Sequence, residues 1–155
     1  MKINMKVTGL NELKVAMRHA AGTVPDAARK QMHRGSDRIV ANAKKMAPVD
    51  RHNLEESIRK EKSYGDRGRL QIDIMAGGTV NGVDVDQYAV IMHESDYSLG
   101  KASRAKQAGQ SEIVGPKFLE RAAMQEAKHM QGYVKKSVFS TLSAIFKGLV
   151  RSITG

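Results

Sequence analysis

The sequence contains no cysteine and no tryptophan, and aromatic residues make up only 5% of its 155 positions. Without cysteine, the chain cannot form disulfides, bind a metal through thiolates or use a thiol nucleophile. No stretch approaches the roughly 18 apolar residues of a membrane span, and residues 1–10 lack the apolar run of a signal peptide. We therefore expect a soluble, intracellular protein without a membrane partner.

Motifs for catalysis and cofactor binding are also missing. There is no glycine-rich phosphate loop and no G-x-S-x-G nucleophile elbow. His93, Glu94 and Asp96 lie close together in "MHESD", but their spacing matches no standard metal site. The adjacent Glu55 and Glu56 are explained by the preference for acidic residues at a helix start. The sequence thus predicts a protein that is not an enzyme and that has no metal or cofactor.

Acidic residues are scarce relative to basic ones. The chain has 26 Lys and Arg against 16 Asp and Glu, a net charge of +10. Such a surplus favours a polyanionic partner, nucleic acid above all. Only Tyr64 is interleaved with the basic stretches 29–34 and 59–69, so a base-stacking platform is not indicated. Contact with a phosphate backbone remains open, and it would weaken steeply with salt.

What the chain does contain is enough apolar sequence for one domain, which we expect over residues 1–155. Hydrophobic residues make up 41%. Alternation in residues 1–8 predicts an N-terminal strand. Helical spacing follows over residues 10–47, with a stop at Gly22, a restart at Pro25 and an end before Pro48.

The segment 48–95 is expected to hold a corner, a short helix and strands. Asp50 or Asn53 would cap the short helix, and Leu54 and Ile58 would face the core. The stretch "KSYGDRGR" predicts a turn or hairpin tip before a strand in "RLQIDIMAG". Asn81-Gly82 predicts a second hairpin turn, and "QYAVIMHES" fits either a strand or a short helix.

The last third combines a basic segment with the longest helical pattern. Residues 96–113 show little periodicity and are expected to form a basic loop, with Lys101, Arg104 and Lys106 as contacts for DNA or another partner. Residues 115–154 carry apolar positions at a period close to 3.6, which predicts a long C-terminal helix that either kinks or packs against a neighbouring subunit. The fold class expected is α+β, with a small antiparallel sheet packed against long helices.

Three motifs, taken in order, resemble the tail-completion or head–tail joining (neck) family of long-tailed bacteriophages. The resemblance spans Leu10 to Ala127. Its motif residues are Ala47, Pro48, Val49, Asp50, Leu54, Ser57 and Ile58 in the first, Tyr88, Ala89 and Glu94 in the second, and Pro116, Phe118, Leu119 and Ala122 or Ala123 in the third. The sequence departs from the family pattern at His52, where glycine is usual, and at Ser95 and Asp96, where a glycine follows the glutamate.

This resemblance implies a structural virion protein of the phage neck. The family's members form a ring, expected to be a hexamer, that completes the tail and joins it to the head connector around the DNA channel. The expected partners are copies of the same chain, the connector or adaptor, and tail-tube or terminator proteins, with non-specific DNA contact in the channel. The protein would be assembled in the host cytoplasm and reside in the virion.

Two other classes stay open on the sequence. A tail terminator or a minor capsid protein could be built similarly. A stand-alone protein that binds nucleic acid independently of sequence would use the charge alone, and a steep salt dependence in the isolated monomer would identify it.

Overall fold

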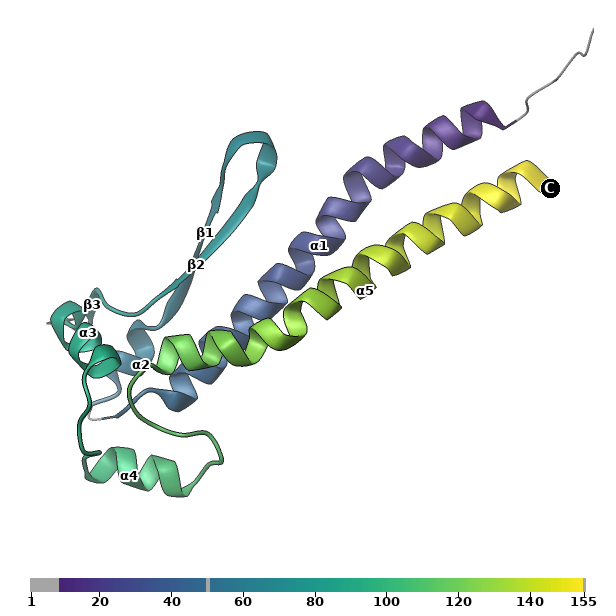
Figure 1. Ribbon diagram of the computed structural model, residues 1–155. Coiled ribbons are helices and arrows are strands. Elements are labelled where there is room, and N and C mark those ends of the chain that lie inside the picture. Colours follow the sequence, from purple (N-terminus) through teal and green to yellow (C-terminus); the bar gives the residue numbers. More distant parts are fainter. Residues whose placement is uncertain (1–8, 50, 155) are drawn as a thin grey trace, which may run out of the picture. The chain divides into compact units, whose positions relative to one another are not determined.

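The computed structural model describes residues 9–49 and 51–154 (Figure 1). Within them the chain forms α1 (Leu10–Met46), α2 (Asn53–Ser57), β1 (Arg59–Tyr64), the short 3-10 turn η1 (Asp66–Gly68), β2 (Leu70–Met75), β3 (Thr79–Val80), β4 (Val83–Asp84), α3 (Asp86–Glu94), α4 (Lys101–Ala108) and α5 (Phe118–Thr154). The chain divides into two compact units. We call residues 32–130 the core unit, and residues 9–31 with 131–154 the paired-helix unit.

The paired-helix unit consists of the first part of α1 and the last part of α5. The two segments are antiparallel, because residues 11–19 line a groove together with residues 144–152, whereas Ser137 Oγ lies 3.5 Å from the carbonyl oxygen of Ala27. Every described residue of this unit is at least partly exposed. The unit therefore has contacts between its helices but no fully buried core.

α1 runs without a break through the position where the sequence predicted a stop. Gly22 and Pro25 both lie inside the helix. Proline removes one backbone hydrogen bond, but the neighbouring alanines on both sides are strong helix formers. Asp26 and Arg29, joined by an ion pair of 2.8 Å, add support to the turn after the proline. The prediction of two separate helices was therefore wrong.

The core unit contains two antiparallel hairpins. In the first, β1 pairs with β2 from Arg59 opposite Met75 to Tyr64 opposite Leu70, and η1 forms its tip. In the second, β3 pairs with β4. Asn81 and Gly82 form its turn with φ of 52° and 76°, the left-handed pair that this dipeptide favours. Both turn predictions are confirmed, and so is the α+β fold class.

The hydrophobic core lies where the end of α1, α2, α3 and the start of α5 meet. Its buried residues are Ala43, Met46, Ala47, Leu54, Ile58, Val85, Ala89, Phe118 and Ala122. The prediction that Leu54 and Ile58 face the core is confirmed by their exposures of 2% and 1%. An ion pair borders this core, with Nε of the exposed Arg38 2.9 Å from Oε2 of the buried Glu126.

Two segments of the core unit are more helical than the sequence indicated. The stretch around Tyr88 and Glu94 forms α3, so the strand alternative was wrong. Part of segment 96–113, expected to be a loop, forms α4. Periodicity could not reveal α4, because this helix is held by polar contacts rather than by an apolar stripe. The expected strand in residues 1–8 and the capping role of Asp50 lie outside the described residues.

The sequence has no apolar stretch long enough to predict a membrane-spanning helix. Among the described residues, none of the helices combines the length and the hydropathy needed to cross a bilayer.

Candidate protein-contact site

The corner after α1, residues 47–58, holds most of the first motif. Pro48 is buried and ends the helix, because the residue before a proline avoids helical angles. A helix end leaves four backbone carbonyl groups without partners in the helix. The way in which this chain satisfies those carbonyls explains the role of the segment that follows α3.

Partners for these carbonyls come from residues 106–115, far along the chain. Lys106 Nζ donates to the carbonyl oxygens of Lys44 and Ala47 at 2.6 and 2.7 Å. Gln110 Nε2 donates to Lys45 O at 2.9 Å, and the backbone N–H of Gly115 donates to Met46 O at 3.0 Å. A cation at the end of a helix also stabilises the helix dipole. The segment 106–115 is thus the cap of α1.

Lys106 was predicted to contact DNA or another partner, and the structure instead places its ammonium group in internal contacts. In addition to the two carbonyls, it pairs with the carboxylate of Glu55, and its side chain is 18% exposed. Lys101 and Arg104, the other two residues of that prediction, are exposed on α4. Lys106 is therefore less exposed than Lys101 and Arg104.

Ser103 fastens α4 to the corner. Its hydroxyl accepts a hydrogen bond from the N–H of Val49 at 2.9 Å and donates one to the carbonyl oxygen of the same residue at 3.0 Å. Ser103 is 3% exposed. Both backbone groups of the residue after Pro48 are thereby satisfied by one buried side chain. Sequence reasoning missed Ser103, because nothing local distinguishes it from other serines of that segment.

His52 keeps the backbone shape that glycine would adopt freely at this position. Its φ is 64°, in the left-handed region that favours glycine. Its Nδ1 lies 2.6 Å from Glu55 Oε2, and its carbonyl oxygen accepts the N–H of Glu56 as α2 begins. Asn53 is the first residue of α2 rather than its cap, so that prediction was wrong.

Ser57 connects the corner to the loop after β2. Its hydroxyl donates to Leu54 O at 2.7 Å and accepts the N–H of Gly77 at 3.1 Å. Arg59 Nη1 donates to Gly77 O at 2.6 Å. Gly77 has φ of 127°, and a Cβ there would lie 2.4 Å from Asp86 Oδ1, so only glycine fits. Ser57 therefore has an architectural role.

The second and third motifs meet at the junction between α3 and α5. The carboxylate of Glu94 contacts the ammonium of Lys117 and Nδ1 of His93. The hydrogen bond from Lys117, then that from His93, lowers the pKa of Glu94, and the same bond to Glu94 raises the pKa of Lys117. The fully buried Phe118 packs edge-on against His93, with ring centroids 5.0 Å apart. Partly buried Leu119 packs against the core.

Arg121, like Ser103, is a residue of the site that the sequence did not reveal. Its guanidinium donates to the carbonyl oxygens of Ile113, Gly115 and Pro116 at 2.8 to 3.1 Å. These contacts fix the loop that carries Pro116 before α5 begins. An arginine inside an amphipathic helix gives no sequence signal for such a role, because its partners are backbone atoms.

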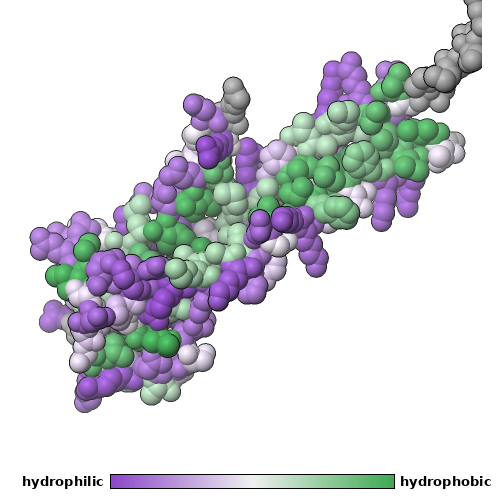
Figure 2. Space-filling view, viewed as in Figure 1, coloured by the Kyte–Doolittle hydropathy of each residue, from purple (hydrophilic) through white to green (hydrophobic). Residues whose placement is uncertain are grey.

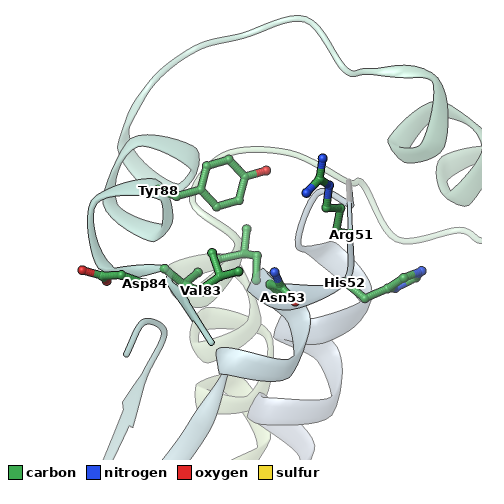
Figure 3. A pocket seen from close by; sticks show the side chains of 8 residues that line it. Arg51, His52, Asn53, Val83, Asp84 and Tyr88 are labelled. Atoms are coloured by element: carbon green, nitrogen blue, oxygen red, sulfur yellow. The ribbon is translucent and has the colours of Figure 1, made fainter. Parts of the chain in front are cut away.

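The exposed side of the corner carries two cavities that share Tyr88. One, of about 210 Å³, is lined by residues 51–54, 83–85 and Tyr88. In Figure 3 the ring of Tyr88 stands over this cavity with its hydroxyl directed to the side of Arg51, whereas His52 points away. The other, of about 600 Å³, lies between Pro48, Tyr88 and α4. Tyr88 lines both cavities and is 38% exposed, so an aromatic side chain lies at the surface between them.

Tyr97 lines the larger cavity and stays neutral in it. Its hydroxyl donates to Met92 O at 3.0 Å. Burial, reinforced by nearby Tyr88, raises the pKa of Tyr97 to about 12. Among the described residues no cluster of three or more metal-ligating side chains occurs. The surface thus offers hydrogen-bonding groups and apolar hollows, the features of a contact surface between proteins.

The first motif thus builds a corner that side chains from distant parts of the chain hold in place. A comparison with protein families identifies the family of the chain. The family described as "Bacteriophage HK97-gp10, putative tail-component" matches residues 11–92, more than half of the chain. The chain belongs to this family and is a bacteriophage tail component, hence a virion protein that interacts with other virion proteins. The predicted phage family is confirmed.

The family match covers α1, the corner, both hairpins and most of α3. It ends before the third motif, so Pro116, Phe118 and Leu119 lie outside it. No curated protein and no solved structure matches the chain. Any more specific role within the phage tail must therefore be argued from the geometry of this chain.

Proposed function

We propose that this chain is a structural, non-enzymatic protein of the phage neck. Copies of it form a ring, a hexamer, that completes the tail and joins it to the head connector around the DNA channel. The observation that carries the proposal is the family match over the corner and hairpins, together with the resemblance of the motifs to neck proteins. The ring would assemble in the host cytoplasm as one tail-completion-like domain.

The corner supplies a surface suited to fixed protein contacts. Lys106 and Ser103 hold its backbone, and Arg121 holds the loop whose Gly115 N–H donates to Met46 O, so partner-facing atoms are held in place before binding. Preorganised contact surfaces lose little conformational entropy on association. Tyr88, between its two cavities, provides the aromatic anchor that such interfaces favour. We assign this face to a neighbouring subunit or to the connector or tail-tube protein.

The exposed Lys101 and Arg104 are proposed to contact an anion-bearing partner. The net charge of +10 supports a contact with DNA in the channel, and it supports an acidic protein ring equally. Binding to DNA would fall steeply between low and physiological salt, and replacing both residues by Gln would flatten that dependence.

The test is particle assembly. A phage that lacks this protein should accumulate filled heads and separate tails, and the purified protein added back should join them. Light scattering should give the mass of six chains of 17.0 kDa, and electron microscopy a ring with a central channel. A strict monomer that fails to join heads and tails would overturn the proposal. Tails of uncontrolled length in the mutant would identify a tail terminator instead.

A tyrosine variant tests the corner face within this assay. Tyr88→Ala should leave the monomer folded, because the aromatic ring of Tyr88 is partly exposed. It should reduce the joining of heads to tails. Val90→Ala, at an exposed position of the same helix, is the matched control.

A further inference from the structure

The paired-helix unit carries an unusual amount of exposed apolar surface. Val15 and Met17 on α1 are 64% and 63% exposed, and Phe139 on α5 is 75% exposed. Leu10, Phe146, Val150 and Ile153 are also exposed. Figure 2 shows hydrophobic surface over the N-terminal end of α1 and the C-terminal end of α5. A helix buries its apolar stripe against another element in a stable protein.

The apolar surface occupies more than one side of the helix pair. Val15 and Met17 are two residues apart and so point about 200° apart around the helix. On the side of Val15, a groove of about 590 Å³ runs between the two helices. Ala16, Ala144 and Gly148 line it, and the space at Gly148 is open because a Cβ there would meet nothing within 4 Å. Small residues along a groove leave room for side chains of another helix.

The charge of the unit selects the kind of partner. Its described residues include eight basic and two acidic side chains, a net charge of +6, and no acidic residue follows Glu126 in the chain. The paired-helix unit of a second copy would bring a further +6 and repel the first. Nucleic acid would match the charge, but phosphates offer nothing to Phe139 and Phe146. A flat membrane surface would not enter the groove between the two helices.

We propose that the paired-helix unit binds an acidic amphipathic helix of another virion protein. The apolar stripe of that helix lies in the groove between α1 and α5, and its carboxylates face Lys147 and Arg151, which are next to the groove-lining Gly148 and Ser152 of α5. The result is a helical bundle completed by two proteins, in the mode in which amphipathic helices enter apolar grooves. The inference rests on the proposed function in one respect, namely that the partner is another virion protein.

Cross-linking within assembling particles tests the inference on the full chain. A photoreactive benzophenone side chain replaces Val15, which lines the groove and is 64% exposed, and phage are assembled with this protein. The matched control places the same group at Met17, which is 63% exposed and about 200° around the same helix. Mass spectrometry of the irradiated particles should find position 15 cross-linked to an acidic helical segment of a different virion protein, well above the level at position 17.

Other products of this experiment would overturn the inference. They are a cross-link to α1 or α5 of another copy, a cross-link to DNA, or equal yields at both positions. If the Val15 variant does not enter particles, the group is moved to Ser152, which lines the same groove from α5. Particle incorporation is scored in the same sample, so a failed inference is distinguished from a failed neck assignment.

A charge reversal provides the second arm. Lys147→Glu with Arg151→Glu should reduce the cross-link from position 15 by about tenfold, because like charges would then face each other at the edge of the interface. Lys147→Arg with Arg151→Lys keeps the charge and should leave the yield unchanged. An unchanged yield in the reversed variant would show that charge does not select the partner.

Discussion

The two units of this chain use the same two helices in opposite ways. In the core unit, the end of α1 and the start of α5 contribute Met46 and Phe118 to a buried core. In the paired-helix unit, the other ends of the same helices bury no described residue and expose large apolar side chains. A helix segment is thus stabilised within the chain at one end, and at the other it depends on what binds to it.

The comparison is tested most strongly by removing one aromatic ring from each unit. Phe118→Ala should lower the free energy of unfolding by about 3–5 kcal/mol, because it leaves a cavity in a closed core. Phe139→Ala, at a 75% exposed position, should change the stability of the isolated chain by no more than about 0.5 kcal/mol. Urea unfolding monitored by circular dichroism measures both. Similar losses would show that the paired-helix unit has a core of its own.

Replacing a glycine by alanine should lower stability in the core unit and raise it in the paired-helix unit. Gly77→Ala should cost about 2 kcal/mol, since the position has positive φ and the new Cβ would meet Asp86. Gly148→Ala should instead stabilise its helix by about 1 kcal/mol, because alanine is the better helix former and the space is open. Thermal unfolding of the two variants checks this. Destabilisation by Gly148→Ala would mean that the groove is closed.

Two basic residues of α4 differ in role, because Lys106 caps α1 whereas Arg104 is exposed at the surface. Lys106→Met should lower stability by about 1–3 kcal/mol, because it leaves two carbonyl oxygens and Glu55 without their shared donor. Arg104→Met, an exposed change of the same charge on the same helix, is the control and should be nearly neutral. Chemical unfolding compares them. Equal effects would contradict the capping role.

The smallest effect concerns pH at the junction of α3 and α5. Lys117 and His93 lower the pKa of Glu94, so the carboxylate contributes stability above its ordinary pKa of 4.5 and loses it as the pH falls through the lowered value. For Lys117, whose pKa is raised, the contribution is present below its ordinary value of 10.5 and disappears as the pH rises through the raised one. Nuclear magnetic resonance titration of the Glu94 carboxyl should give a midpoint below 4.5.

Lys117→Met tests the cause of that shift. It should move the Glu94 midpoint upward, toward the ordinary value, because the ammonium group that stabilises the charged form is gone. Lys117→Arg keeps the cation and serves as the control. A midpoint that is the same in both variants would assign the shift to His93 alone.

Local patterns predicted the parts of the fold that local chemistry determines. The end of α1 at Pro48, the Asn81-Gly82 turn and the inward faces of Leu54 and Ile58 all follow from properties of a few neighbouring residues. The break predicted at Pro25 was wrong, because the helix-forming alanines around it and a local ion pair outweigh one lost hydrogen bond. Propensity at a single residue did not decide the outcome there.

The candidate site was predicted less completely, because its contacts join distant parts of the chain. Lys106 caps a helix that ends about sixty residues earlier, and Arg121 binds only backbone oxygens. Neither the spacing of residues nor their type indicates such partners. The sequence identified these segments through motif resemblance, and the structure supplies the physical reason for the positions it marks.

The left-handed backbone at His52 has a consequence for how this corner can change during evolution. The turn requires a backbone angle rather than a particular side chain, and a histidine meets the requirement while its ring contacts Glu55. A position of this kind can exchange glycine for a functional side chain without rebuilding the turn. The chemistry of an exposed surface can therefore change at this position while the backbone of the turn keeps its shape.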